Sequence, residues 1–200
     1  IGGGWRLQVL DVIADGSSLV AAENEFNDPP PAGSAFTLVK VAMGYYGLRE
    51  PVTSFEPTIS AVGGSAVELS SDCGLIPDEL DLFRDAFAGG VLVGNLCFVT
   101  TPADIEGLQL YATGEPFGEV EVFLSAVPPA ELPTVLPTLA GPQDGADLTD
   151  ARRAPITLGT AVDVGDGWTL TVTGAARDIT DAVLAENEFN EPPPDGLRFV

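Results

Sequence analysis

Histidine is absent from this 200-residue chain, and Lys40 is its single lysine. Without histidine the sequence cannot form a Ser-His-Asp or Cys-His nucleophilic site, a histidine general base or a histidine metal ligand. The glycine-rich motifs that cradle phosphates, GxxxxGK[ST] and GxGxxG, are missing as well. We therefore expect a protein that is not an enzyme, with no catalytic residues and no cofactor.

Positive charge is scarce, with 8 basic residues against 30 acidic ones and a net charge of −22. A field of this sign repels phosphate backbones and anionic lipid, so we expect no nucleic-acid partner. The same field attracts cations or basic proteins. The sequence also has no run of 18 apolar residues, so we expect no transmembrane segment in this chain.

Cysteine occurs twice, at Cys73 and Cys97. An even pair in a β-rich sequence fits a single disulfide in an oxidising, extracytoplasmic compartment. Such a bond would close a loop of about 24 residues and stabilise the fold by about 3 kcal/mol. Two buried free thiols of a cytosolic protein remain the alternative. Neither cysteine has a second cysteine at metal-ligand spacing, so we expect no metal site of this kind.

One block of sequence is written twice: AAENEFNDPPPAG at 21–33 returns as LAENEFNEPPPDG at 184–196. Residues 1–37 and 164–200 align without a gap, share 18 of 37 positions, and place Trp5 on Trp168. This self-similarity predicts a tandem duplication. We expect a domain at 1–126 that has lost its first strand, a proline-rich acidic linker at 127–152, and the N-terminal part of a second copy at 153–200.

The stretches between turn signals alternate between apolar and polar residues, which predicts antiparallel β-structure. Strands are expected within 5–12, 35–47, 89–100, 117–126 and 168–175. In 35–47, Val39, Val41, Met43 and Tyr45 should share one face, with Lys40 on the other. The nearly continuous apolar run 89–100 predicts a central strand covered on both faces. Only 77–87 is expected to hold a helical turn or two, and the fold class is all-β, an antiparallel sandwich.

The repeated block has a physical interpretation as a rigid connection between strands. Asn24 and Asn27 are turn formers, the prolines impose extended geometry, and Gly33 supplies a bend. Phe26 is expected to insert into the core. The alternative is a direct ligand contact through Glu23, Asn24 or Asn27.

Trp5 with its alternating strand, AENEFN, PPP, Gly33 and FTLVKVAMGYYG resemble a bacterial domain family of unknown function. That family has a telokin-like, immunoglobulin-type β-sandwich and is similar to the immunogenic secreted antigen of mycobacteria. The later AGGVLVGNLCFVTTPAD, preceded by Cys73, resembles its closing strands. The resemblance covers about 1–125 and 153–200. It implies an extracytoplasmic binding or interaction module, carried by secreted proteins or lipoproteins, without established catalytic residues.

The leading hypothesis is thus a non-enzymatic, secreted or lipid-anchored protein of tandem immunoglobulin-like domains that binds an unidentified protein or small molecule. A first alternative is a secreted hydrolase, or its accessory domain, that uses two carboxylates. A second is an adhesive array stabilised by calcium, because oxygen ligands gather in the repeated block and in DGADLTD; neither stretch has EF-hand spacing. The candidate oxygen ligands are Asp15, Glu23, Asn24, Glu25, Asn27, Asp28, Asp144, Asp147 and Asp150.

Overall fold

The structure is a computed structural model that describes residues 2–47, 51–54, 57–114, 119–126, 157–174, 177–187 and 189–200. The chain divides into two compact units, Ile1–Arg153 and Ala154–Val200, and each is described by itself. The linker predicted at 127–152 lies outside the described residues.

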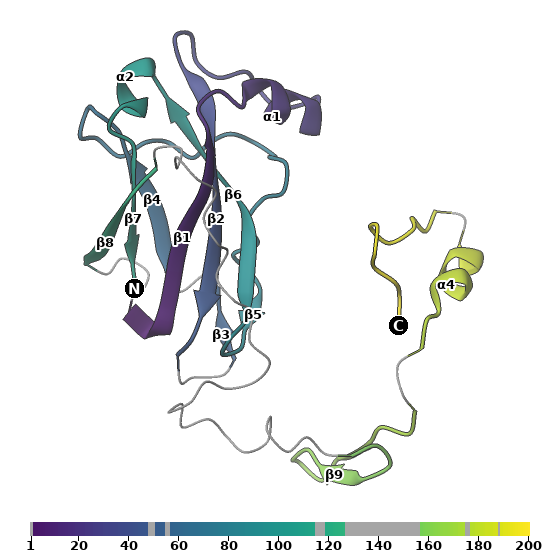
Figure 1. Cartoon of the computed structure of the whole chain (residues 1–200). Coiled ribbons are helices and arrows are strands. Elements are labelled where there is room, and N and C mark those ends of the chain that lie inside the picture. The colour runs from purple at the N-terminus through teal and green to yellow at the C-terminus, as the bar shows by residue number, and fades with distance from the viewer. Residues whose placement is uncertain are drawn as a thin grey trace. The chain divides into compact units, whose positions relative to one another are not determined.

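The first sheet of unit 1 has three antiparallel strands in the order β1-β2-β6 (Figure 1). They are β1 (Trp5–Ile13), β2 (Ala35–Tyr45) and β6 (Val91–Thr100). The central strand is therefore β2, and the prediction that 89–100 forms a central strand is wrong. The apolar character of β6 has another cause: the segment at 70–80 runs along its outer side, where Val99 N–H donates to Ser70 O at 2.8 Å and Leu80 N–H donates to Asn95 O at 3.0 Å.

A second antiparallel sheet, in the order β4-β7-β8, contributes to the same core. Its strands are β4 (Thr58–Val62), β7 (Gln109–Thr113) and β8 (Val120–Ser125). Val12, Val39, Val41 and Phe98 of the first sheet form one buried cluster with Ala61 and Leu110 of the second. A short ladder joins β3 (Val52–Thr53) to β5 (Asp85–Ala86). The prediction of a mostly β, antiparallel fold is confirmed.

The two faces of β2 enter different clusters, as its alternation predicts. Val39 and Val41 belong to the main core, while Met43 and Tyr45 pack with Trp5. On the other face, Phe36 and Leu38 pack with Val20 and both cysteines. Lys40 lies on this second face, further along the strand, where it is half-buried.

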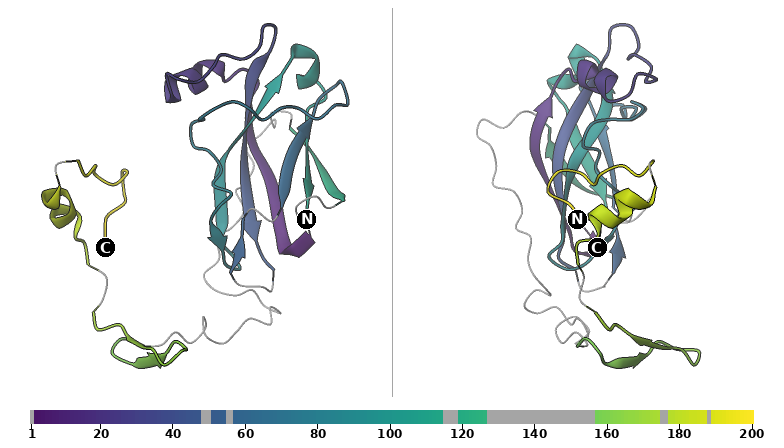
Figure 2. Two further views of the ribbon diagram at one scale, coloured as in Figure 1. Left: turned by 180° about the vertical axis from the view of Figure 1, so that it is seen from behind. Right: turned by 90° about the vertical axis from the view of Figure 1, so that its right-hand side faces the viewer.

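Helices in unit 1 are short and lie at one end of the strands, away from the N-terminus (Figures 1 and 2). They are α1 (Ser17–Glu23) and α2 (Pro102–Ile105), and a 3-10 turn, η1 (Gly2–Gly4), precedes β1. The helical turn predicted at 77–87 is wrong, because that segment holds turns and β5. Asp78 there has a φ of 48°, outside the helical region.

Unit 2 contains a hairpin of β9 (Ala161–Asp163) with β10 (Thr169–Thr171), followed by α4 (Thr180–Glu186). Most of its large apolar side chains are exposed, and none of those described is fully buried: Trp168 is 73% exposed, whereas Trp5 of unit 1 is 1% exposed. The secondary structure of unit 2 is thus held by backbone and short side-chain bonds.

Candidate functional site

The repeated block lies in a closed corner of unit 1, residues 15–36, which we name the first corner. It begins where the carboxylate of Asp15, two residues before α1, accepts a hydrogen bond at 3.1 Å from the N–H of Ser17, the first residue of α1. It closes where Phe36 N–H donates to Ser17 Oγ at 3.1 Å and Gly16 N–H donates to Phe36 O at 2.7 Å. Both ends of the segment are therefore fastened to each other.

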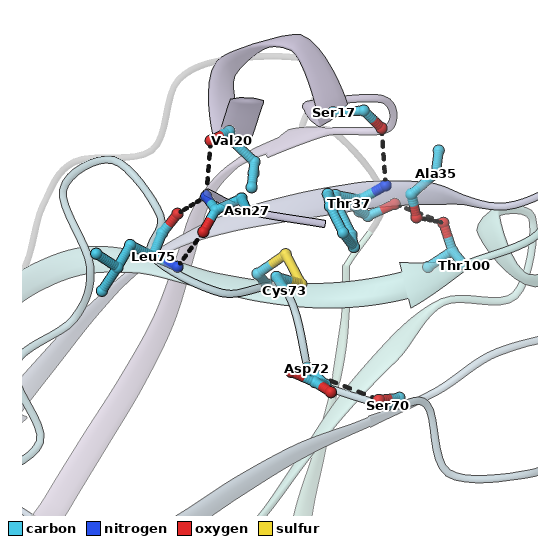
Figure 3. The surroundings of a disulfide bond; sticks show 12 residues. Ser17, Val20, Asn27, Ala35, Thr37, Ser70, Asp72, Cys73, Leu75 and Thr100 are labelled. Atoms are coloured by element: carbon cyan, nitrogen blue, oxygen red, sulfur yellow. Dashed lines mark hydrogen bonds between the residues drawn. A yellow bond between two sulfur atoms is a disulfide. The ribbon is translucent and has the colours of Figure 1, made fainter. Parts of the chain in front are cut away.

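Asn27 fastens the middle of the first corner to the rest of unit 1. Its Nδ2 donates to Val20 O at 2.8 Å and to Leu75 O at 2.7 Å. Its Oδ1 accepts from Leu75 N–H at 3.0 Å and from Asn24 Nδ2 at 3.2 Å. Figure 3 shows Asn27 between Val20 and Leu75, beside the disulfide. A side-chain amide has two donor hydrogens and two acceptor lone pairs, so these bonds occupy the whole amide and give Asn27 a structural role.

The segment that receives Asn27 is held by a disulfide between Cys73 and Cys97 of β6, with a sequence separation of 24. Gly74 lies between Cys73 and Leu75, has a φ of 73° and contacts the Asn27 side chain. A Cβ at this position would collide with Asn27 Oδ1. Glycine therefore allows both the left-handed backbone and the close approach of the amide.

Unit 2 repeats the geometry of the first corner in residues 178–199, which we name the second corner. Thr180 N–H donates to Asp178 Oδ1, Phe199 N–H donates to Thr180 Oγ1, and Asn190 Nδ2 donates to Val183 O. Each of these bonds has its counterpart 163 positions earlier. Gly33 and Gly196 also share a left-handed φ, of 84° and 82°.

Phe26 is 84% exposed, and its counterpart Phe189 is 81% exposed. The prediction that Phe26 inserts into the core is therefore wrong. The turn that begins at Asn24 explains this orientation: Phe26 N–H donates to Asn24 Oδ1 at 3.2 Å, and Asn27 N–H donates to Asn24 O at 3.1 Å. Val20 of α1 and Phe36 fill the core position instead.

A cavity of about 410 Å³ opens beside Phe26, between the first corner and the segment at 70–80 that carries Cys73, which we name the disulfide segment. Pro29 and Pro31 line it on one side, and Asp72 and Gly74 line it on the other. Phe36 and Val99 also border it. We name the exposed part of this region, Phe26, Asp28, Pro29, Pro31 and Asp72, the Phe26 surface. It combines a rigid aromatic ring with carboxylates, and it is the candidate binding site.

The other two residues predicted as ligand contacts lie next to this surface. Glu23 is the exposed last residue of α1, and no hydrogen bond or ion pair is recorded for it among the described residues. Asn24 is half-buried and uses both of its amide atoms within the turn. Of the predicted trio, Glu23 is therefore the one that presents its polar group to solvent. Sequence reasoning missed Phe26 as a surface residue, although its run of polar neighbours was a signal.

Asp104 is the one buried carboxylate in the described part of the chain, and its partners are structural. Its Oδ2 accepts from Thr101 N–H at 3.0 Å and from Thr101 Oγ1 at 2.7 Å, in a capping box that starts α2. The backbone hydrogen bond from Thr101 is the main cause that holds the pKa of Asp104 below its usual value. A glycosidase general acid needs a raised pKa, so Asp104 does not suit that role.

The described residues contain no group of three or more acidic or cysteine side chains placed to hold a metal ion. Asp144, Asp147 and Asp150, which the sequence offers as calcium ligands, lie outside those residues. None of the helices in the described part of the chain has the length and hydropathy needed to cross a bilayer.

No protein-family model and no curated protein matches the chain. Among solved structures, the chain is similar to YcdA of Bacillus subtilis, a provisionally assigned lipoprotein, at 20% sequence identity and a TM-score of 0.43. The likeness covers 59% of this chain and 34% of that protein, so the chain spans about a third of its length. A likeness this weak carries no argument about function. The family resemblance drawn from AENEFN and the strands around it rests on those motifs.

Proposed function

We propose that the chain is a non-enzymatic binding module of an extracytoplasmic, secreted or lipid-anchored protein, built from tandem immunoglobulin-like sandwiches. The disulfide Cys73–Cys97 supports the compartment, because such bonds persist where the environment is oxidising. The shared core of two antiparallel sheets in unit 1 supports the sandwich. The second corner supports the tandem arrangement, because it repeats the bonds of the first.

The observation that carries the binding role is the Phe26 surface. A large aromatic side chain that is 84% exposed loses the free energy of burial unless a partner covers it. Phe26 is also preorganised, since Asn24, Asn27 and the disulfide fix the backbone around it. Rigid aromatic anchors of this kind dominate protein–protein binding energy.

Charge selects the partner that this surface would bind. Glu23, Glu25, Asp28 and Asp72 surround Phe26 in sequence or across the cavity, and all four are exposed. The whole chain carries a net charge of −22. We therefore propose that the partner presents a basic segment with proline or aromatic residues, in which Lys or Arg faces the carboxylates and the apolar group packs on Phe26.

The test is a displayed random-peptide library selected on the full chain, followed by affinity measurement with synthetic versions of the enriched peptides. We expect the peptides to combine Lys or Arg with proline or aromatic residues and to bind less tightly at high salt. The double variant Phe26→Ala/Phe189→Ala should weaken binding by about 30-fold, the typical effect of losing a hot-spot aromatic.

Phe83→Ala is the matched control, because Phe83 is a phenylalanine of unit 1 with the same 84% exposure and lies outside the Phe26 surface. It should leave the affinity within about twofold. Peptides that bind the double variant as tightly as the unaltered chain, or that are lost in Phe83→Ala instead, would refute the proposed surface.

A further inference from the structure

A second cavity of unit 1 contains the single lysine of the chain, and it has a volume of about 310 Å³. It lies on the face of the first sheet that α1 and the disulfide segment cover only in part. Lys40 stands on the central strand β2, paired in register with Asp11 of β1 on one side and Asn95 of β6 on the other. Directly paired residues point to the same face of a sheet. These three side chains therefore form one polar row across the floor.

Next to this row is an apolar one. Leu38 of β2 pairs with Ile13 of β1 on the same face, two positions away from Lys40. Ile13 and Leu38 line the cavity, and so do Leu19 of α1 and Pro77. Leu38 is buried, while Ile13 and Leu19 are exposed at the rim. The cavity is thus amphipathic, with aliphatic groups on one side and charges on the other.

The charged side chains of this cavity make few hydrogen bonds within the described part of the chain. No ion pair or hydrogen bond of the Lys40 ammonium is recorded with any of the residues that the structure describes. Asp11 accepts one hydrogen bond, from Val12 N–H at 2.8 Å. An ammonium group on the floor of a cavity, with room beside it, is a ready partner for a carboxylate.

Pro77 and Asp78 form the rim of the cavity beyond β6, and Asn95 holds them in place. Its Nδ2 donates to Pro77 O at 2.8 Å, and its backbone N–H donates to Asp78 O at 2.7 Å. Its carbonyl accepts from Leu80 N–H at 3.0 Å. These bonds hold Asp78, another lining residue, at the edge of the cavity with a φ of 48°. Two acidic residues therefore line the cavity together with Lys40, Asp11 on the sheet and Asp78 on the rim.

We propose that this cavity, the Lys40 pocket, binds a free aliphatic α-amino acid. The ligand carboxylate meets Lys40, its ammonium group faces Asp11 and Asp78, and its side chain packs on Ile13 and Leu19. A simple anion is disfavoured, because two carboxylates line the same cavity as the one ammonium. Cross-strand Cβ atoms lie about 4.5–5.5 Å apart, a spacing that suits two opposite charges on one ligand carbon. The volume is at the lower end for ligand sites, about 300–1,000 Å³. This site is separate from the Phe26 surface.

The test uses L-leucine and three matched probes that each lack one feature: 4-methylpentanoate lacks the ammonium group, 3-methylbutylamine lacks the carboxylate, and glycine lacks the side chain. Selective ¹⁵N-lysine labelling of the full chain gives one side-chain ammonium signal, because Lys40 is the single lysine. We expect L-leucine to shift this signal in a saturable way and to bind roughly tenfold or more tightly than each probe.

Variants separate recognition from folding. Lys40→Gln should reduce leucine affinity by roughly tenfold to a hundredfold in calorimetry. Asp78→Asn should also weaken it while keeping a residue that tolerates left-handed backbone. Asp85→Asn, an exposed carboxylate of β5 outside both the Lys40 pocket and the Phe26 surface, is the control and should leave leucine binding unchanged.

The proposal is overturned by any of three results: no binding of L-leucine up to about 10 mM, equal binding of 4-methylpentanoate, or leucine affinity that survives Lys40→Gln. A stable Lys40–Asp11 ion pair in solution would produce the first of these, with an ammonium signal that leucine does not move. Loss of peptide binding at the Phe26 surface would leave all of these measurements unaffected, so the two proposals fail independently.

Discussion

The first and second corners have nearly the same internal hydrogen bonds and very different burial. In unit 1, Val20 is fully buried and Phe36 is 4% exposed, and both belong to a core cluster with the disulfide. In unit 2, the counterparts Val183 and Phe199 are only partly buried. The corner is therefore specified by local sequence, through its Asp, Ser or Thr, Asn and Gly positions. Its burial comes from Leu38 of the adjoining strand β2 and from partners far away in the chain, namely β6 and the segment around Cys73.

The two tryptophans give the largest expected contrast. Trp5→Ala should lower the free energy of unfolding by about 3–5 kcal/mol, because Trp5 is buried against Met43 and Tyr45. Trp168→Ala should change it by less than about 0.5 kcal/mol, since that side chain is largely exposed. Chemical denaturation of the full chain, followed by circular dichroism, measures both. Similar losses in the two variants would mean that Trp168 has a packed environment.

The second-largest expected difference between the two units comes from breaking the disulfide. Both cysteines are in unit 1, and breaking their bond by Cys73→Ser/Cys97→Ser should destabilise that unit by about 3 kcal/mol. The amide resonances of unit 2 should remain unchanged. Thiol titration of the native protein is the companion measurement. Two reactive thiols in unaltered protein would remove the argument for an oxidising compartment.

The asparagine pair tests how firmly each corner is docked. Asn27→Ala should cost about 2–3 kcal/mol, because it removes three hydrogen bonds between the Asn27 side chain and the backbone of Val20 and Leu75. Asn190→Ala removes the one bond recorded for its side chain, to Val183, and should cost about 1 kcal/mol. Hydrogen exchange gives a direct readout, since Leu75 N–H should lose its protection in Asn27→Ala. Retained protection there would contradict the role of Asn27.

Truncating either exposed phenylalanine, Phe26 or Phe189, should have almost no effect on stability, so the two units should not differ in this respect. Phe26→Ala and Phe189→Ala should each change the free energy of unfolding by less than about 0.5 kcal/mol, as usual for surface substitutions. The same denaturation experiment applies. A loss near 3 kcal/mol in Phe26→Ala would restore the core position that the sequence pattern suggested and would remove the basis of the Phe26 surface.

The smallest effects concern the carboxylates that start the corners. A side-chain hydrogen bond with Ser17 lowers the pKa of Asp15 below 3.8, and the backbone bond from Thr180 does the same for Asp178. A lowered pKa in the folded state means that the stabilisation is present above pH 3.8 and is lost as the pH falls through the folded pKa. Carboxyl NMR titration should find both values below 3.8. Ser17→Ala should raise that of Asp15, and an unchanged value would show that Ser17 is not the cause.

Much of the fold is predictable from the sequence, because alternation with period two determines which residues of β1 and β2 face the core. The Asn and Gly positions of the corners are also predictable, since turn chemistry is local. The exposure of Phe26 was not predictable from the sequence, because it depends on Val20 and Phe36 filling the core position that Phe26 would have occupied. The edge position of β6 was hidden by the disulfide segment, which covers it. The Lys40 pocket depends on the register of three strands and a loop, so only the folded chain brings Asp11, Lys40 and Asp78 together.

Two copies of one exposed phenylalanine on one chain also affect the strength of binding to a repetitive target. Phe26 and Phe189 stand on the same frame and present the same chemistry. Once one of them is engaged, a second contact on the same target becomes intramolecular, governed by effective concentration instead of bulk concentration. Avidity of this kind exceeds the affinity of a single contact by about 10²–10⁴-fold when the geometry allows both to engage. A weak contact at each corner would therefore be enough to hold the protein on a surface where its target is densely repeated.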